Sequence, residues 1–318
     1  MATCMFRLCH EYYLCALDLS KAFDKTNHHG LFTKLMDRML PNNLLSTLEY
    51  WFSICSTCVR WGDCFSSFIR LECGVRQGGV LSPHFFAVYI NDIVKVIQRS
   101  NFGCKIGIIG ISIFLYADDI ILLSPTVTAL QRLLTLCEEH LIQLDLTLNS
   151  NKSVCLRIGS RFKDECAALT TLSGESVNWV NSVRYLGIHI VAAKKFSICI
   201  TKNKQSYYRS CNAVFSKVGR FASEEVVLQL ISSKCLPMFT YGLDACPVSL
   251  THSRTLDFVG TRTIMRIFKT NSVDIVTECQ HRFNFQKISE IVHRKKRMFL
   301  YKFIKYENAF CRLFGNVA

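Results

Sequence analysis

The sequence contains few of the residues that mark fibrous or low-complexity proteins. Only 5 of its 318 residues are proline and 15 are glycine, which excludes collagen-like and low-complexity architectures. Charged residues make up 19% and hydrophobic residues 50%, so the chain can bury a core and is not intrinsically disordered. The first residues carry Arg7 and Glu11 and lack a long apolar run, so we expect no signal peptide. The length predicts roughly two domains.

Cysteine, in contrast, is abundant, with 17 residues. An odd number scattered through apolar segments predicts free thiols in a reducing, intracellular compartment, without distinguishing nucleus from cytoplasm. Cys55 and Cys58 have the spacing of a zinc-ligating pair. However, the segments STCVRWG and CFSSFIRL around them indicate two strands of a hairpin, and no second close Cys or His pair is present beyond them. We therefore favour a hairpin at about 57–71 over a zinc site.

Positive charge is concentrated in one part of the chain. Residues 1–190 hold 17 Lys and Arg against 16 Asp and Glu, whereas residues 191–318 hold 21 against 8, an excess of +13 out of the total of +14. This asymmetry indicates a part that binds a polyanion beside a nearly neutral part, with a solvated basic surface as the alternative. The run His293-Arg294-Lys295-Lys296-Arg297 lies on the polar side of an expected helix, where a solvated face, phosphate contact or a nuclear-import signal would each explain it.

One apolar segment, residues 106–124, is long enough to span a bilayer. Asp118 and Asp119 lie together inside it, and each carboxylate would cost about 2.5–3.5 kcal/mol at the centre of a membrane helix. The β-branched residues and the acidic pair fit two buried strands joined by a short turn. We therefore predict no transmembrane helix and no membrane partner.

The pattern of the first half predicts an α+β sheet with helices on one face. Apolar runs predict strands at 12–19, 153–158 and 183–190, besides the hairpin around the acidic pair. Residues at helical spacing predict a helix interrupted at Pro41 (28–55), one that begins at Ser82-Pro83, and one over 128–146.

The second half predicts a small all-α domain. Helical patterns cover residues 200–218, 223–236, 251–269 and 287–306, punctuated by Pro237 and Pro247. We place the domain boundary after residue 195, which gives domains 1–195 and 196–318.

Asp18, Asp118 and Asp119 each end or interrupt an apolar strand. An isolated carboxylate there is expensive to bury, and two adjacent ones raise each other's pKa. Carboxylates from neighbouring strand ends can hold a pair of Mg²⁺ ions, which bind phosphates and activate a hydroxyl. Each Asp taken alone would be interpreted as a turn cap, but together, beside a basic domain, they favour phosphoryl transfer on nucleic acid.

Five ordered blocks give the sequence a resemblance to the reverse transcriptases of non-LTR (LINE-type) retrotransposons. The blocks are LDLSKAFD from Leu17, GVRQGGVLSP from Gly74, FLYADDIILLS from Phe114, TLNSNKS from Thr147 and VRYLGIHI from Val183. The segment from Leu230 to Lys269, with LPMFTYG at its centre, also resembles the region C-terminal to the polymerase blocks in these elements. The resemblance implies a right-hand polymerase palm and, after it, a helical thumb.

The resemblance also implies roles for individual residues. Asp18 and Asp118 match the carboxylates that hold two Mg²⁺ ions (Mn²⁺ can substitute), with Asp119 in support. Lys152 matches a lysine proposed to protonate the leaving pyrophosphate, with a surface lysine in a turn as the alternative. Phe23, beside Ala22, matches the gate that excludes a 2′-hydroxyl. Gln77 and Gly78 match the block that contacts the incoming nucleotide or template. The primer-grip block is matched by Tyr185, Leu186 and Gly187.

Two departures from the family pattern stand out. Arg76 and Gly79 occupy positions where Pro and Ser are more usual. Only 17 residues precede Asp18, so we expect a chain truncated at its N-terminus, without the fingers region that grips the triphosphate and without the endonuclease domain.

The sequence thus predicts an RNA-directed DNA polymerase domain that adds dNTPs to a DNA primer on an RNA template. The alternatives are a catalytically incomplete or repurposed fragment that binds RNA, and an RNA-dependent RNA polymerase or intron maturase. Phe23 within LSKAFD favours a LINE-type reverse transcriptase over an RNA-dependent RNA polymerase or an intron maturase.

Overall fold

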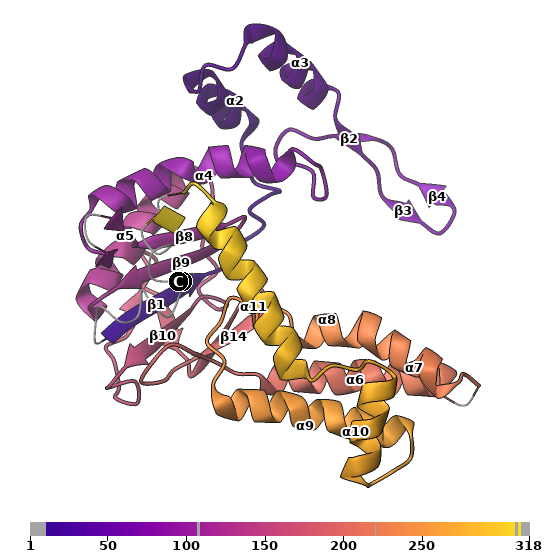
Figure 1. Ribbon diagram of the computed structural model, residues 1–318. Coiled ribbons are helices and arrows are strands. Elements are labelled where there is room, and N and C mark those ends of the chain that lie inside the picture. The colour runs from indigo at the N-terminus through magenta and orange to yellow at the C-terminus, as the bar shows by residue number, and fades with distance from the viewer. Residues whose placement is uncertain (1–10, 107–108, 220, 309–310, 313–318) are drawn as a thin grey trace. The chain divides into compact units, whose positions relative to one another are not determined.

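The computed structural model describes residues 11–106, 109–219, 221–308 and 311–312 (Figure 1). The chain divides into two compact units, one of residues 11–183 and one that holds the described residues from Arg184 onward. This division falls twelve positions before the domain boundary expected after residue 195, which stays a prediction.

The first unit is built on a six-stranded sheet with the strand order β11–β12–β10–β1–β9–β8. β1 lies in the middle and pairs antiparallel with both β9 and β10, while β10 and β12 run parallel. This largely antiparallel sheet confirms the predicted α+β class. The strands are β1 (Glu11–Leu17), β8 (Ile113–Tyr116), β9 (Asp119–Ser124), β10 (Val154–Gly159), β11 (Leu169–Thr170) and β12 (Ser176–Trp179).

Two amphipathic helices, α4 (Ser82–Arg99) and α5 (Val127–Gln143), pack on one face of this sheet (Figure 1). Pro83 stands in the first turn of α4, and the Thr126 hydroxyl caps α5 by accepting the Ala129 N–H. The apolar side chains at helical spacing on these two helices belong to the core of the unit, and Leu144, just after α5, is partly buried against it. The buried ones are Phe86, Tyr89, Ile90, Ile93 and Ile97 of α4 and Leu130, Leu133, Leu134, Cys137 and Leu141 of α5.

Several cysteines serve as small apolar residues in this core. Cys15, Cys137 and Cys155 are fully buried, and burial raises the pKa of Cys137 to about 12. With this pKa the Cys137 thiol remains protonated and unreactive at neutral pH.

Between β1 and α4 the chain forms the helices α2 (His28–Asp37) and α3 (Asn42–Ser53), separated at Pro41 as predicted. The predicted hairpin at 57–71 comes next, but as two short ladders rather than two continuous strands. β2 (Ser56–Thr57) pairs with β5 (Ile69–Arg70), and β3 (Arg60–Trp61) pairs with β4 (Cys64–Phe65). Between these two ladders the Val59 N–H donates to the Ser66 hydroxyl. A side chain therefore accepts the hydrogen bond that a backbone carbonyl would accept in a continuous ladder.

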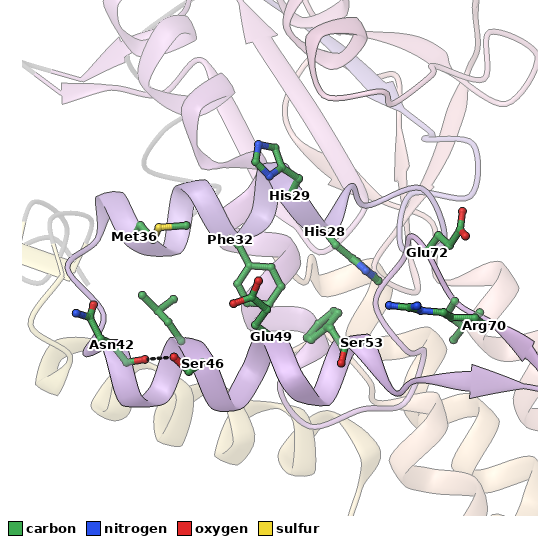
Figure 2. A pocket seen from close by; sticks show the side chains of 13 residues that line it. His28, His29, Phe32, Met36, Asn42, Ser46, Glu49, Ser53, Arg70 and Glu72 are labelled. Carbon is green, nitrogen blue, oxygen red and sulfur yellow. Dashed lines mark hydrogen bonds between the residues drawn. The ribbon is translucent and has the colours of Figure 1, made fainter.

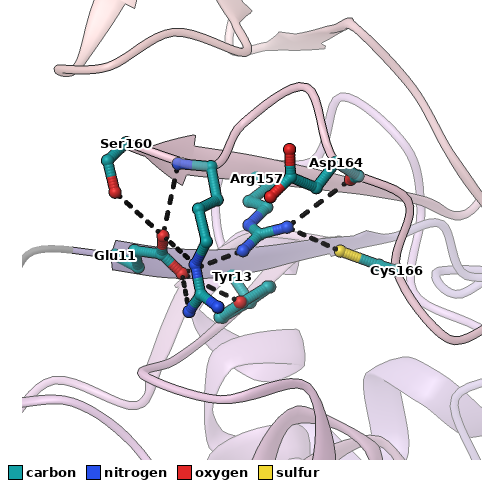
Figure 3. Close-up of polar contacts among 7 residues, drawn as sticks. Glu11, Tyr13, Arg157, Ser160, Asp164 and Cys166 are labelled. Atoms are coloured by element: carbon teal, nitrogen blue, oxygen red, sulfur yellow. Dashed lines mark hydrogen bonds and ion pairs between the residues drawn. The ribbon is translucent and has the colours of Figure 1, made fainter.

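A charged cluster fixes the start of β1 (Figure 3). Glu11 accepts hydrogen bonds from the guanidinium groups of Arg157, at 2.9 Å, and Arg161, at 2.8 Å, and from Ser160. These bonds hold the pKa of Glu11 well below its ordinary value, with Arg161 making the largest contribution. The cluster joins β1 to β10 at the end opposite Asp18.

A small sheet follows, made of β13 (Ser182–Tyr185), β14 (Ile188–Val191) and β15 (Ser197–Ile198), and the division between the two units falls within β13. The single strand predicted at 183–190 is therefore wrong. Leu186 and Gly187 both have positive φ, at 46° and 81°, so the chain turns there instead of continuing.

Most of the other described residues of the second unit are helical. Tyr207, Phe239, Leu256, Val259 and Ile288 form part of its own core, which confirms the predicted helical C-terminal region. The helix expected at 223–236 includes a π-helical segment, and α10 was not predicted. The helices are α6 (Thr201–Val218), α7 (Glu224–Leu230), η1 (Ile231–Cys235), α8 (Leu236–Phe239), α9 (Leu250–Ile267), α10 (Val273–Arg282) and α11 (Ile288–Lys305). None of the described helices has the length and apolarity to cross a membrane.

Candidate functional site

Strand register brings the predicted carboxylates together at one edge of the sheet. β1 pairs with β9 up to Leu17 opposite Ile120, so the next positions, Asp18 and Asp119, face each other. Asp118 lies in the tight turn between β8 and β9, where Tyr116 pairs with Asp119. Ala117 adopts a φ of 54° in this turn, a conformation that costs a non-glycine residue energy and is found preferentially at functional sites.

The negative charges of the other two carboxylates act on Asp119. The pKa of Asp119 is raised, first by partial removal from water and then by the negative charges of Asp118 and Asp18. Across the described residues, no three His, Cys, Asp or Glu side chains are arranged to enclose a metal ion. The donor chemistry nevertheless fits Mg²⁺, which prefers carboxylate oxygens, and a cation would relieve the repulsion that acts on Asp119.

Lys152 also reaches this edge. The pairing of β1 with β10 ends at Ala16 opposite Val154. Two residues beyond this pair on each chain segment stand Asp18 and Lys152, and the Lys152 Nζ lies 3.8 Å from Asp18 Oδ2. Ser153 supports the same residue, because its hydroxyl accepts the Asp18 N–H at 3.1 Å. Lys152 is 71% exposed, so its ammonium group is accessible to a bound molecule.

The segment after Asp18 is held between two other parts of the chain. On one side, Ser20 N–H donates to Thr147 O at 2.9 Å and Lys25 Nζ donates to the Thr147 hydroxyl. On the other, Val75 N–H donates to Phe23 O at 2.8 Å and Gly74 N–H donates to Thr26 O at 2.7 Å. The block that begins at Leu17 is therefore in contact with the blocks that begin at Gly74 and at Thr147.

Phe23 and Ala22 lie inside this segment. Ala22 is buried, and the Phe23 ring stacks on Phe86 with 4.8 Å between centroids. Phe23 is half-buried, so one part of the ring is fixed by the core while another part remains accessible.

Gln77 and Gly78 are both exposed on the loop that leads from Gly74 to α4. Gly78 has a φ of 83° and open space where a Cβ would lie. The loop is anchored at Arg76, whose guanidinium donates to Ser56 O at 3.2 Å and whose carbonyl accepts the Gly79 N–H. Arg76 and Gly79, which depart from the family pattern, thus build a turn that presents Gln77 and Gly78 to solvent.

A cleft of about 790 Å³ lies between α2, α3 and β5 (Figure 2). His28, Phe32, Phe52 and Arg70 are among the residues that line it. His28 shares a hydrogen bond between Nε2 and Gly74 O at 2.8 Å, and its ring meets Phe52 edge to face. The cleft therefore adjoins the junction of the first two blocks.

Tyr185, Leu186 and Gly187 belong to the second unit. Leu186 and Gly187 line a cavity of about 730 Å³ together with the basic residues Arg184, His189, Lys202 and Arg209. No acidic residue is found among the described residues that line it. The pKa of His189 is lowered, first by burial and then by the positive charges of Arg184 and Lys202. Because no acidic residue among the described lining residues balances these charges, the cavity is suited to phosphate groups.

Two supporting residues were not singled out from the sequence. Ser153 fixes the backbone at Asp18, and Gly74 adopts a φ of 90° where a Cβ would lie 2.8 Å from Asp24 O. Both stand inside the quoted blocks, but a role that depends on contact between distant segments leaves no pattern in one sequence.

Comparison with known proteins places these features in a family. The family model described as reverse transcriptase (RNA-dependent DNA polymerase) matches residues 2–190. The chain is 29% identical over 196 residues to a Pol polyprotein of the type-2 retrotransposable element R2DM of Drosophila melanogaster, which covers 59% of this chain and 18% of that protein. It is 27% identical over 203 residues to the RNA-directed DNA polymerase of the mobile element jockey of Drosophila funebris, covering 61% and 21%.

Among solved structures, apo telomerase from Candida tropicalis aligns with 90% of this chain and 46% of its own, at a TM-score of 0.47 and 13% identity. The chain spans about a fifth of the length of the two retrotransposon proteins above. Since the family model covers more than half of the chain, including the carboxylates, Lys152 and the Gln77 loop, the chain belongs to the reverse transcriptase (RNA-dependent DNA polymerase) family.

Proposed function

We propose that this chain carries the catalytic centre of an RNA-directed DNA polymerase, which extends a DNA primer on an RNA template with dNTPs. The observation that carries the proposal is the strand register that sets Asp18 opposite Asp119, with Asp118 in the adjoining turn and Lys152 Nζ 3.8 Å from Asp18. In the reaction the primer 3′-oxygen bonds to the α-phosphorus of the nucleotide, and the bond to pyrophosphate breaks.

Asp18 and Asp118, supported by Asp119, would hold the metal. When bound, two Mg²⁺ ions activate the attacking hydroxyl and neutralise the charge that develops on the leaving group. Lys152 would donate a proton to the departing pyrophosphate, because its exposed ammonium lies beside Asp18. Catalysis of this type rests on positioning and charge, and the hydrogen bonds around residues 18–26 supply the positioning.

Phe23 and Gln77 would select and hold the nucleotide. The Phe23 ring is held against Phe86, and a sugar bound over it would meet a steric barrier to a 2′-hydroxyl. Gln77 stands exposed on its anchored loop, where its amide can meet the nucleotide or template.

The primer is proposed to run along the second unit. The turn at Leu186 and Gly187 and the basic cavity beside it present Lys202 and Arg209 to a phosphate backbone. Recognition of an RNA–DNA hybrid there would depend on shape and charge more than on sequence.

Primer extension on an RNA template with Mg²⁺ tests the proposal. We expect the Asp118→Asn substitution to reduce extension by more than about 100-fold, because it removes charge from the catalytic centre. Asp37→Asn, an exposed carboxylate at the end of α2, should leave extension unchanged.

Binding of the template–primer separates polymerase from a fragment that only binds RNA. The Asp118→Asn variant should bind the hybrid as the wild type does. Extension that survives this substitution would refute the metal assignment. A wild-type chain that binds but does not extend would favour the binding fragment.

A further inference from the structure

An arm of residues 56–70, which comprises β2 to β5, exposes large aromatic side chains to solvent. Trp61 is 86% exposed, Phe65 64% and Phe68 78%. Figure 1 shows β3 and β4 standing away from the sheet of their own unit. Exposed apolar side chains gathered on one element are typical of an interaction site.

The rings are available on both faces of the arm. Arg60 pairs with Phe65, and Trp61 pairs with Cys64 across the turn at Gly62, which has a φ of 60°. Cross-strand partners share a face and successive residues alternate, so Trp61 and Phe65 lie on opposite faces. The Arg60 guanidinium lies 5.5 Å from the centroid of the Phe65 ring, a cation–π contact on the exposed surface.

The base of the arm is joined to the proposed nucleotide site. Ser56 pairs with Arg70, and the Ser56 carbonyl accepts a hydrogen bond from Arg76, next to Gln77. Arg70 and His28 also line the cleft described above (Figure 2), and Phe52 is another of its lining residues. Aromatic rings and guanidinium groups therefore continue from this cleft to the tip of the arm.

We propose that the arm binds unpaired nucleobases of a single-stranded nucleic acid by stacking them on Trp61 and Phe65. The exposed rings provide stacking surfaces for bases, and Arg70 on the arm and Arg76 beside its base provide positive charge for phosphates, whereas Arg60 also pairs with Asp63 at 3.9 Å. We favour nucleic acid over a protein partner because the arm is joined to the Gln77 loop, and this choice of ligand rests on the proposed function. The bound single-stranded nucleic acid would be the unpaired part of the template.

Tryptophan fluorescence tests this inference on the full chain without Mg²⁺ or dNTPs. The probes are a single-stranded oligoribonucleotide and an abasic oligonucleotide of the same length. We expect the base-bearing strand to quench the part of the emission that Trp61→Leu removes, and the abasic strand to leave it unchanged. Trp61→Leu should weaken binding of the oligoribonucleotide about 5- to 150-fold, as expected for the loss of one stacked base.

Matched variants separate stacking from mere apolar contact. Trp61→Phe keeps a ring and should retain most of the affinity, whereas Leu keeps only apolar surface. Phe258→Ala, which removes a ring that is 56% exposed on α9, should bind as the wild type does. Since Trp61 contributes almost nothing to the core, the far-ultraviolet circular dichroism of its variants should match the wild type.

Unchanged affinity in Trp61→Leu, or equal quenching by the abasic strand, would overturn the inference. Self-association of the chain that Trp61→Leu abolishes without affecting oligonucleotide binding would assign the arm to a protein contact and overturn it too. Quenching that persists in Asp118→Asn would support it independently of catalysis. A chain that shows base-dependent quenching but extends no primer would refute the polymerase proposal alone.

Discussion

At the scale of single residues, the candidate site depends on side chains held by few but specific contacts. Phe23 is an example, since its ring is fixed on Phe86 and its backbone carbonyl accepts the Val75 N–H. The ring is therefore both a core residue and a wall of the proposed nucleotide site.

Phe23→Ala should relax the choice of sugar. With the ring removed, a 2′-hydroxyl no longer meets a steric barrier, so ribonucleotide incorporation relative to deoxynucleotide should rise about 10- to 100-fold. Single-nucleotide extension kinetics measure this ratio. Phe32→Ala, which removes another half-buried ring of the same unit, should alter stability without changing the ratio. Equal relaxation in both variants would contradict the gate assignment.

Glu11 offers a residue-scale prediction about stability. Its pKa is lowered in the folded chain, so its contribution to stability is complete above the ordinary carboxyl pKa and is lost as the pH falls towards the lowered value. Glu11→Gln leaves Arg157, whose side chain is only 7% exposed, without its partner, and should cost about 3 kcal/mol at pH 7.

Urea unfolding at several pH values checks this expectation. The difference between wild type and Glu11→Gln should shrink between pH 5 and pH 2, as the wild-type carboxylate is protonated. The control is Glu278→Gln in α10, where both partners of the ion pair with Arg282 are exposed, so little change is expected. A difference that is independent of pH would show that Glu11 acts through packing rather than charge.

At the scale of secondary-structure elements, the site exists because three chain segments meet beside β1. Gly74 is the point of closest approach, since a Cβ there would lie 2.8 Å from Asp24 O and its φ is 90°. Gly74→Ala should therefore move the 73–75 segment away from Phe23, destabilise the unit by more than about 2 kcal/mol and reduce extension.

Gly174→Ala is the matched control for Gly74→Ala. Gly174 also has a positive φ, at 81°, but nothing lies within 4 Å of an added Cβ. The alanine then costs stability only through its positive φ, by about 1–2 kcal/mol, and extension should be unaffected. Thermal unfolding and primer extension measure the two effects. Equal behaviour of the two variants would mean that the contact with Asp24 plays no part in the site.

The same elements show what a single sequence can predict. Sequence patterns were sufficient for β1, β8, β9, β10, α4 and α5, because apolar residues recur regularly or continuously along each of these elements, but they missed the short strands β11 and β12. It failed at 183–190, where an apolar run conceals a turn formed by Leu186 and Gly187. The carboxylates were visible as charges inside apolar runs, whereas the roles of Ser153 and Gly74 depend on register between distant segments and had no local signature.

At the scale of the whole molecule, the uneven distribution of charge corresponds to the division into two units. The excess of +13 lies in residues 191–318, and the described part of these residues belongs to the unit that contains the basic cavity. The first unit contains the acidic site and is close to neutral. Affinity for nucleic acid and catalysis are therefore expected to respond to different substitutions.

Salt dependence of binding tests this separation. Each phosphate contact that is lost lowers the slope of log K against log salt concentration by about 0.7–0.9. The double substitution of Lys202 and Arg209 by Gln should therefore lower the slope for an RNA–DNA hybrid by about 1.4–1.8, while single-turnover extension of pre-bound hybrid changes little. Lys163→Gln, an exposed lysine of the first unit, should leave the slope unchanged. An equal decrease in both variants would mean that general surface charge, rather than this cavity, holds the nucleic acid.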